Sequence, residues 1–179
     1  MAGPGYPPIK VSVNLSVNQF SQANLVDMIG DILQSTGLSP HLLELEMTES
    51  IFADVENAAS ILQRIKKLGV RTSIDDFGTG YASFNYIKQL PVDTLKIDAS
   101  FIRDIHQNKE SHAIVKAILT IGQTLNLNVI AEGVENEEQL AVLSQDGCGQ
   151  AQGYFFSRPL STHDFEHFLK EHHPHDFPI

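Results

Sequence analysis

Two adjacent acidic residues, Asp75 and Asp76, lie between a short apolar run and a glycine-rich stretch, in the segment SIDDFGTGY at residues 73–81. Residues that are adjacent on a strand normally point to opposite faces of the sheet. At the end of a strand, where the backbone turns, two such carboxylates can converge on one or two cations. A tight turn is the alternative, because Asp and Gly both favour turns. This segment alone leaves both interpretations open.

Strand-like and helix-like segments alternate along the chain around this segment. Strands are expected at residues 9–14, 42–47, 70–74, 94–97, 128–131 and 150–156. Helices are expected between them, at residues 22–36, 54–69, 83–89, 112–125 and 137–145, and from Ser161 onwards. Strict alternation indicates a parallel sheet, because a helix must return the chain before each parallel strand. An open doubly wound sheet and a (βα) barrel both fit this pattern.

Every expected strand ends in a polar or charged residue. In chain order these residues are Asn14, Glu46 and Glu49, Asp75 and Asp76, Lys96 and Asp98, Glu132 and Glu135, and Gln152. In both parallel architectures, functional groups gather at the carboxyl ends of the strands. Helix capping does not explain the pattern, because four of these residues are poor N-caps, namely Glu46, Lys96, Glu132 and Gln152. We therefore predict a functional site along this rim.

The rim offers oxygen ligands from Asn and carboxylates, with no Cys and no pair of His among them. Such ligands suit magnesium, manganese or calcium. Several acids around Asp75 and Asp76 suit a cluster of two metal ions roughly 3.5–4 Å apart, which activates water for attack on a phosphoryl group. Lys96 either forms a buried ion pair with the acids or orients the attacking water, and both roles can hold together.

The composition indicates one globular domain between two short ends. Of the 179 residues, 42% are hydrophobic, which is ample for a core. We expect an extended lead-in at residues 1–8, the domain at residues 9–171 and a tail rich in His and Pro at residues 172–179. The net charge of -10 argues against binding of a DNA or RNA polymer through a basic surface.

The cysteine content and the hydropathy bear on the compartment. Cys148 is the only cysteine, which excludes an intrachain disulfide and suits the reducing cytoplasm. No apolar run approaches the roughly 20 residues that span a membrane. We therefore expect a cytoplasmic protein without a membrane segment.

Six motifs carry a resemblance to a known family. In chain order they read NLS, ELEMTES, DDFGTGYASF, LPVDTLKID, VIAEGVE and QGYFFSRP. The chain closely resembles the EAL domain family of cyclic di-GMP phosphodiesterases along nearly its whole length after Pro8. The resemblance implies an α/β fold, a (βα)8 barrel of the TIM type, that hydrolyses cyclic di-GMP to the linear dinucleotide pGpG. It also implies two magnesium or manganese ions as cofactors, with calcium as an inhibitor.

The resemblance assigns metal binding and catalysis to particular rim residues. Those that match metal ligands of the family are Asn14, Glu46, Asp75, Asp76 and Glu132. Glu132 is similar to the general base, which also contacts the metal-bound water. Lys96 resembles a neighbour that holds the water and the metals, and we expect Lys96 and Asp76 to take part in catalysis with Glu132.

Five further residues are expected around the reaction centre, and two of them, Gln152 and Glu49, resemble groups of the family. The residues expected to contact the substrate or to lie behind the metal ligands are Gln152, Asp98, Glu135 and Arg158. Arg158 is the nearest arginine to the rim that could meet a phosphate. Glu49 is similar to the residue that anchors the loop after the third expected strand. That loop, at residues 77–83, resembles one that couples metal binding to dimerisation.

One departure from the family pattern concerns the N-terminal side. The Glu-Ala-Leu signature strand, which supplies a metal-binding Glu and a nearby phosphate-binding Arg in the family, has no counterpart in this sequence. About six strand–helix units are visible, where the family barrel has eight. We therefore expect an incomplete barrel without the first two strands, and a homodimer or another partner that completes it.

Two functional hypotheses follow. The first is a metal-dependent phosphodiesterase, which the retained acids favour. The second is a catalytically inactive module that binds cyclic di-GMP or a protein partner in signalling, which the missing Glu favours. A hydrolase on an open sheet ranks third, since the sequence has neither a G-x-S-x-G motif nor a P-loop.

Five histidines gather towards the C-terminus, namely His163, His167, His172, His173 and His175. They could bind a transition metal. A polar tail is the favoured interpretation, because chain ends are usually poorly ordered.

Overall fold

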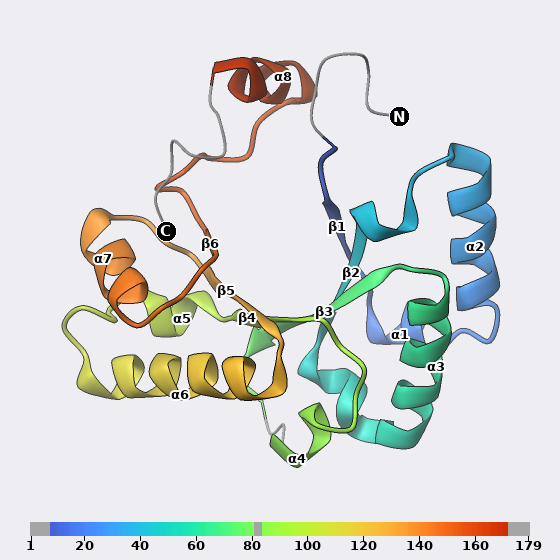
Figure 1. Cartoon of the computed structure of the whole chain (residues 1–179), viewed down its shortest axis with the longest axis horizontal. Helices are drawn as coiled ribbons and strands as arrows, with labels where there is room; N and C mark the ends of the chain where they lie inside the picture. Colours follow the sequence, from blue (N-terminus) through green and yellow to red (C-terminus); the bar gives the residue numbers. More distant parts are fainter. Residues whose placement is uncertain (1–7, 81–83, 172–179) are drawn as a thin grey trace. The chain divides into compact units, whose positions relative to one another are not determined.

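Six parallel strands lie in chain order, from β1 to β6, in the computed structural model of this chain (Figure 1). The structure describes residues 8–80 and 84–171. The strands are β1 (Val11–Asn14), β2 (Leu43–Thr48), β3 (Arg71–Phe77), β4 (Thr94–Ile97), β5 (Asn128–Glu132) and β6 (Ala151–Gln152). A doubly wound sheet would reverse its strand order at a switch point. The sequential order therefore excludes that alternative and favours the barrel.

Helices connect successive strands. The α-helices are α1 (Val17–Phe20), α2 (Leu25–Thr36), α3 (Val55–Lys67), α4 (Phe84–Ile87), α5 (Ala99–Ile102), α6 (Lys109–Leu125), α7 (Glu137–Gln145) and α8 (Thr162–Glu171). Two 3₁₀ segments flank β2, namely η1 (Pro40–Leu42) and η2 (Glu49–Asp54). None of the helices in the described part of the chain has the length and hydropathy needed to cross a membrane.

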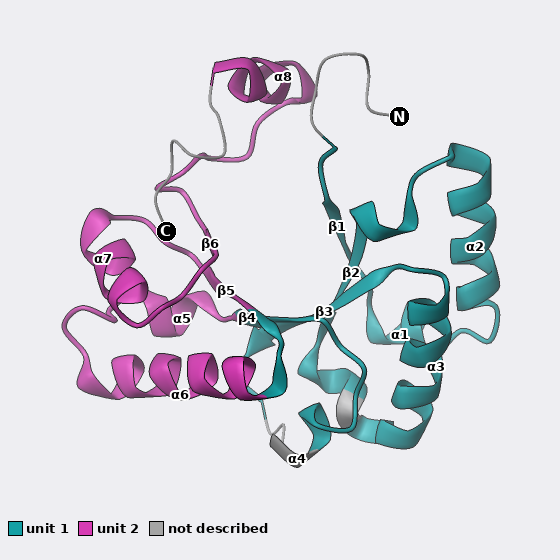
Figure 2. Ribbon diagram, in the orientation of Figure 1, with its two compact units in different colours: residues 1–96, 125–128 teal, residues 97–124, 129–179 magenta. Residues whose placement is uncertain are grey.

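The chain forms two compact units (Figure 2). The first, teal in the figure, contains residues 1–96 and 125–128, and the second, magenta, contains residues 97–124 and 129–179. The first unit carries β1, β2 and β3 with helices α1 to α4. The second carries β6 and helices α5, α7 and α8, together with most of α6 and β5.

One face of the sheet in the first unit packs against helices. Figure 1 shows α2 and α3 together on one side of β1, β2 and β3. Met47 and Ile74 are paired in register, and both are at most 1% exposed. Apolar positions at helical spacing supply the other side of this core, namely Ile29 and Leu33 from α2 and Ala58, Leu62 and Ile65 from α3.

The other face of the same strands is polar, and it is also buried. Glu44 and Glu46 alternate with apolar residues along β2, and Ser73 lies opposite Glu46 on β3. Their exposed fractions are 1% for Glu44, 9% for Glu46 and 0% for Ser73. Burying a carboxylate is costly unless the charge is paired. This face must therefore supply partners for the two glutamates.

Local sequence signals set the ends of the helices in the first unit. The carboxylate of Asp54 accepts a hydrogen bond of 3.1 Å from the backbone N–H of Asn57, which makes Asp54 the N-cap of α3, as predicted. Gly37 ends α2 in the left-handed conformation, with φ of 67°. Helix α2 begins at Leu25, three residues later than the expected start at Gln22.

The second unit has its own apolar core. It is formed by Ile102, Ile105, Val115, Ile118, Leu119, Ala131, Val134 and Leu143. Helix α7 has the predicted bounds, and its N-cap Asn136 exchanges hydrogen bonds with Gln139 in a capping box. The side-chain amide of Gln139 also donates to the carbonyl of Arg103 at 3.0 Å. This hydrogen bond fixes α7 to the turn that follows α5.

The sixth strand is shorter than expected. It ends at Gln152 rather than Phe156, because the next residues form a turn. The N–H of Phe155 donates to the carbonyl of Val134 at 3.0 Å, and the N–H of Phe156 donates to the carbonyl of Gly153 at 3.1 Å. Residues 1–7 of the expected lead-in, residues 81–83 of the expected anchored loop and the expected tail at 172–179 lie outside the described residues.

Candidate functional site

A buried lysine joins two carboxylates on the polar face of the first unit. Lys96 Nζ lies 2.9 Å from Glu46 Oε1 and 3.1 Å from Asp75 Oδ1. The three side chains come from β4, β2 and β3, and they are 4%, 10% and 17% exposed. Each charge is desolvated, so each depends on the others for compensation.

Asp75 and Asp76 lie close together although they are adjacent on β3. Their carboxylates offer oxygens within 4.8 Å of one another. Asp76 has φ of 53°, in the left-handed region that non-glycine residues rarely adopt. This conformation interrupts the regular alternation of strand side chains. Two neighbouring acids can therefore serve one site, and strain of this kind is common at functional positions.

Asn14 stands at the carboxyl end of β1, beside Glu46 in the strand register. Its side chain is exposed. The N–H of the following residue, Leu15, donates to the carbonyl of Glu46 at 2.8 Å. The amide oxygen of Asn14 is therefore held at the same edge of the sheet as the buried glutamate.

Glu49 contacts the segment that follows β3. Its Oε1 accepts a hydrogen bond of 2.7 Å from the backbone N–H of Gly78. Gly80 lies so close that a Cβ at this position would collide with the carboxylate of Glu49. The chain after the two aspartates is thus tied to the 3₁₀ segment that follows β2.

Glu132 and Gln152 are register partners at the carboxyl ends of β5 and β6 in the second unit. Glu132 is half-buried and Gln152 is exposed. The N–H of Val134 donates to the carbonyl of Gln152 at 3.0 Å. A Cβ at Gly153 would collide with the backbone of Val134. Only glycine lets the two turns approach this closely, so Gly153 sets where Gln152 lies.

Asp98 and Glu135 occupy the starts of helices in the second unit. The carboxylate of Asp98 accepts from the N–H of Ser100 at 3.0 Å and caps α5. The N–H of Glu135 donates to Oε1 of Gln139 at 2.7 Å, and the side chain of Glu135 is exposed. The capping role of Asp98 was not predicted, because the short helix α5 has no clear hydrophobic period in the sequence.

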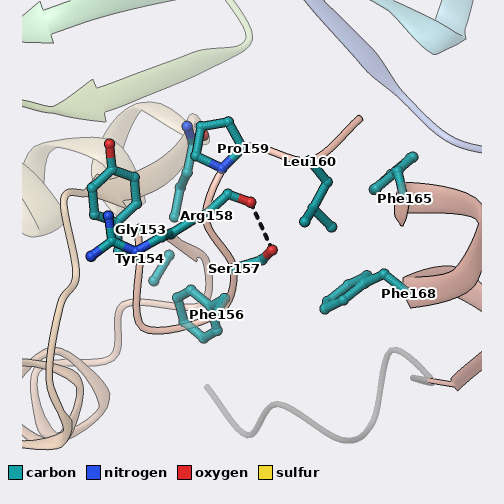
Figure 3. A pocket seen from close by; sticks show the side chains of 11 residues that line it. Gly153, Tyr154, Phe156, Ser157, Arg158, Pro159, Leu160, Phe165 and Phe168 are labelled. Carbon is teal, nitrogen blue, oxygen red and sulfur yellow. Dashed lines mark hydrogen bonds between the residues drawn. The ribbon is translucent and has the colours of Figure 1, made fainter. Parts of the chain in front are cut away.

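Arg158 belongs to a pocket in the second unit (Figure 3). Its guanidinium lies over the ring of Tyr154, 4.8 Å from the ring centroid. The pocket has a volume of about 540 Å³ and is lined chiefly by Tyr154, Phe156, Leu160, Phe165 and Phe168. Sequence reasoning did not predict this pocket, because its lining combines a turn with one side of α8.

Glu44 is a second buried acid that sequence reasoning missed. Its Oε2 forms an ion pair with Lys10 Nζ at 2.8 Å, and its side chain is 1% exposed. The signal was present in the alternation of LELEMT, which places Glu44 and Glu46 on one face of a strand. Two acids on one buried face explain why two lysines, Lys10 and Lys96, reach into it.

The chemistry of the first unit's cluster fits a hard divalent cation. The carboxylates of Glu46, Asp75 and Asp76 and the amide of Asn14 offer oxygen ligands at one sheet edge, of the kind that magnesium and manganese prefer. Asp75 and Asp76 are among the described acids that could hold such an ion. The ammonium of Lys96 supplies positive charge among these acids.

The sequence of this chain matches the family model of the EAL domain over residues 2–159. It is 45% identical to the signaling protein YkoW of Bacillus subtilis over 91% of this chain and 20% of the relative. It is 43% identical to the cyclic di-GMP phosphodiesterase NbdA of Pseudomonas aeruginosa over 93% of this chain and 21% of that protein. The chain thus spans about a fifth of the length of these curated relatives.

Solved structures resemble the fold closely. The PaMucR phosphodiesterase, in complex with c-di-GMP, gives a TM-score of 0.84 at 43% identity over 87% of this chain and 64% of its own. The EAL domain of Mycobacterium smegmatis DcpA gives 0.87 at 35% identity over 91% and 74%. BlrP1 of Klebsiella pneumoniae, solved with cy-diGMP and manganese or calcium, gives 0.78 at 31% identity over 84% and 39%. The expected barrel of the EAL type, in incomplete form, is confirmed.

Proposed function

This chain belongs to the EAL domain family, and we propose that it forms the catalytic part of a metal-dependent phosphodiesterase that hydrolyses cyclic di-GMP to pGpG. The buried cluster of Glu46, Asp75 and Lys96 carries this proposal. Relatives that are named phosphodiesterases, and a solved relative in complex with c-di-GMP, support the choice of substrate.

We propose that two divalent cations, magnesium or manganese, are the cofactors. Their ligands would be Asn14, Glu46, Asp75, Asp76 and Glu132. When bound, such ions polarise a phosphoryl oxygen and lower the pKa of a coordinated water. The manganese complex of a relative supports this assignment. We propose that calcium inhibits, because it prefers more ligands and a looser geometry.

Lys96 is the residue that holds the acids in place before any cation binds. Its ammonium contacts Glu46 and Asp75, which fixes the direction of both carboxylates and offsets their mutual repulsion. Among the catalytic residues we propose Glu132 as the base that accepts the proton of the attacking water. Asp76 would orient that water together with Lys96.

The substrate contacts come from the second unit in this proposal. Arg158 would pair with a phosphate of cyclic di-GMP through its fork of N–H donors. Gln152 would hydrogen-bond the substrate or the reacting water. Asp98 and Glu135 would support these groups from behind, since Asp98 is committed to capping α5.

We propose that Glu49 anchors the loop after β3 and thereby couples the acids to a partner surface. Its hydrogen bond to Gly78 supports this role. The partner would be a second copy of the protein, or a further segment that pairs with β1. Strand β1 ends the order of the sheet, and its Val11 and Val13 are 50% and 45% exposed. Among the residues that the structure describes, no strand pairs with the outer edge of β1, and an unpaired edge favours pairing with another strand.

The exposed edge of β1 also favours a second candidate function. An incomplete barrel could bind cyclic di-GMP or a protein partner without turning the nucleotide over. Such a module would retain the acids only as ligands. Whichever function holds, we propose the cytoplasm as its location, because the single cysteine, Cys148, is buried and the chain relies on no intrachain disulfide.

Hydrolysis of cyclic di-GMP by the full-length protein distinguishes the two candidates. The assay follows pGpG by chromatography with magnesium or manganese, and calorimetry measures binding of the nucleotide separately. In an enzyme, Glu132→Gln lowers turnover by about 100-fold or more, the usual contribution of a general base, while binding persists. If the chain is a binding module, neither the natural protein nor Glu132→Gln hydrolyses cyclic di-GMP, and both bind the nucleotide with the same affinity.

A further inference from the structure

Two histidines lie one turn apart on the exposed helix α8. His163 and His167 are separated by four residues, which places them on the same side of a helix. Their ring centroids are 5.1 Å apart, with the ring planes tilted by 51°. Both residues are exposed, and the side chain of His163 is 80% exposed. The two rings therefore face solvent together.

This spacing matches what one metal ion requires of two imidazoles. A zinc ion binds imidazole nitrogen at about 2.0–2.1 Å with tetrahedral angles, which puts the centroids of two coordinating rings about 5 Å apart. The observed 5.1 Å agrees with that separation.

A carboxylate lies beside one of the rings. Asp164 Oδ1 is 3.5 Å from Nδ1 of His163. The other oxygen of Asp164 accepts a hydrogen bond of 2.7 Å from the hydroxyl of Ser161, which holds the carboxylate in place. A histidine that directs Nδ1 to a carboxylate presents Nε2 to a metal.

We propose that His163 and His167 form a two-histidine site for a divalent transition metal ion, of the class of zinc, nickel or copper. Imidazole ligands favour these ions, whereas the carboxylates at the strand ends favour magnesium and manganese. The two sites therefore select different metals. Water or a further side chain would complete the coordination of an ion that the two rings hold.

Occupancy of this site would stabilise α8. The helix has ten residues and none of them is buried, and isolated helices of this length are only marginally stable in water. A metal ion that bridges positions four apart links successive turns. Phe165 and Phe168 of the same helix point towards Leu160 in the pocket (Figure 3). A bound ion would thus hold the side of the pocket that α8 supplies.

The test is titration of the full-length protein with zinc chloride, monitored by calorimetry in excess magnesium. His172, His173 and His175 are first replaced by Ala, so that only the pair on α8 remains among the C-terminal histidines. We expect zinc to bind this background, and His163→Ala and His167→Ala each to weaken that binding at least tenfold. Glu166→Gln, on the same helix, serves as the matched control and should leave the affinity unchanged.

Two further measurements test whether loss of the helix, rather than loss of a metal ligand, weakens zinc binding in the histidine variants. His167→Gln keeps a polar side chain on α8 and should weaken zinc binding as strongly as His167→Ala. Circular dichroism should show helix content rising with zinc in the background protein and not in the two histidine variants. Equal zinc affinity in the background protein and in the double variant His163→Ala/His167→Ala would overturn the proposal.

Discussion

Lys96 and Glu46 form a buried ion pair of 2.9 Å that crosses the strand lying between them, because β3 separates β2 from β4. The same ammonium also lies 3.1 Å from Asp75 on that middle strand. The lysine thus links three neighbouring strands at the point where their acids converge. A metal site built here must coexist with a cation that the chain itself supplies.

Replacing Lys96 should show how far Glu46 and Asp75 depend on its positive charge. Lys96→Met leaves Glu46 and Asp75 buried without a counter-charge, and we expect it to destabilise the protein by about 3–5 kcal/mol. Manganese should raise the melting temperature of the variant more than that of the natural protein, because the ion replaces the lost charge. Thermal unfolding with and without manganese measures both effects. Equal metal-induced shifts in the two proteins would show that the lysine and the metal serve different groups.

Gly80 tests the role of Glu49. A Cβ at position 80 would displace the carboxylate of Glu49 from Gly78. The carboxylate is the flexible end of its side chain, so we expect Gly80→Ala to change the melting temperature little. Turnover should fall at least tenfold, and Glu49→Gln should reproduce the loss. Full activity in Gly80→Ala would mean that the hydrogen bond between Glu49 and Gly78 has no functional role.

Gly153 tests how the turn after β6 is positioned. A Cβ there would meet the backbone oxygen, nitrogen and carbon of Val134, none of which can move alone. We expect Gly153→Ala to lower the free energy of unfolding by about 1–3 kcal/mol or more. Gly149→Ala is the matched control, because nothing lies within 4 Å of a Cβ at that position. Chemical denaturation measures the unfolding free energies of the two variants. Similar values for Gly153→Ala and Gly149→Ala would contradict the close contact between Gly153 and Val134.

Asp104 gives a pH dependence. Hydrogen bonds from the side chains of Asn108 and Ser111 hold the pKa of this carboxyl below its ordinary value of 3.8. A lowered pKa in the folded state contributes stability above the ordinary value, and that contribution is lost as the pH falls through the folded value. Asp104→Asn should therefore lower stability at neutral pH and flatten its decline below about pH 4. Urea unfolding of the natural protein and the variant between roughly pH 2 and 7, a range that covers the titration of carboxyl groups, measures this dependence. Parallel curves of unfolding free energy against pH for the two proteins would contradict this role of Asp104.

Elements with strong local signals were predictable. The bounds of α7 and β4 match the expected ones, because capping and burial agree along those segments. The short helices α1 and α5 were missed, since four residues carry too little periodicity. The last strand was overextended, because Phe155 and Phe156 favour strands in isolation. The approach of Gly153 to Val134 overrides that preference, and no local sequence pattern reveals it.

The acids of the rim were also predictable as a set, and so was a buried ion pair between Lys96 and these acids, but not which of the acids Lys96 contacts. Strand alternation places Glu46 on one face, yet it does not indicate that Lys96 reaches it across β3. The left-handed conformation of Asp76 is likewise invisible in the sequence, although it lets Asp75 and Asp76 offer oxygens within 4.8 Å. Contacts of this kind depend on how distant segments pack. The sequence therefore predicted the types of ligand, whereas their arrangement in space required the structure.

Production of pGpG from cyclic di-GMP by the full-length protein and its Asp75→Asn variant tests the central claim most directly. Both proteins are assayed with manganese at equal concentrations of folded protein, as judged by circular dichroism. The substitution removes one negative charge from the cluster and keeps the size of the side chain. We predict turnover by the natural protein and none above background by the variant. Equal turnover in both would contradict the assignment of these acids as the metal-binding centre.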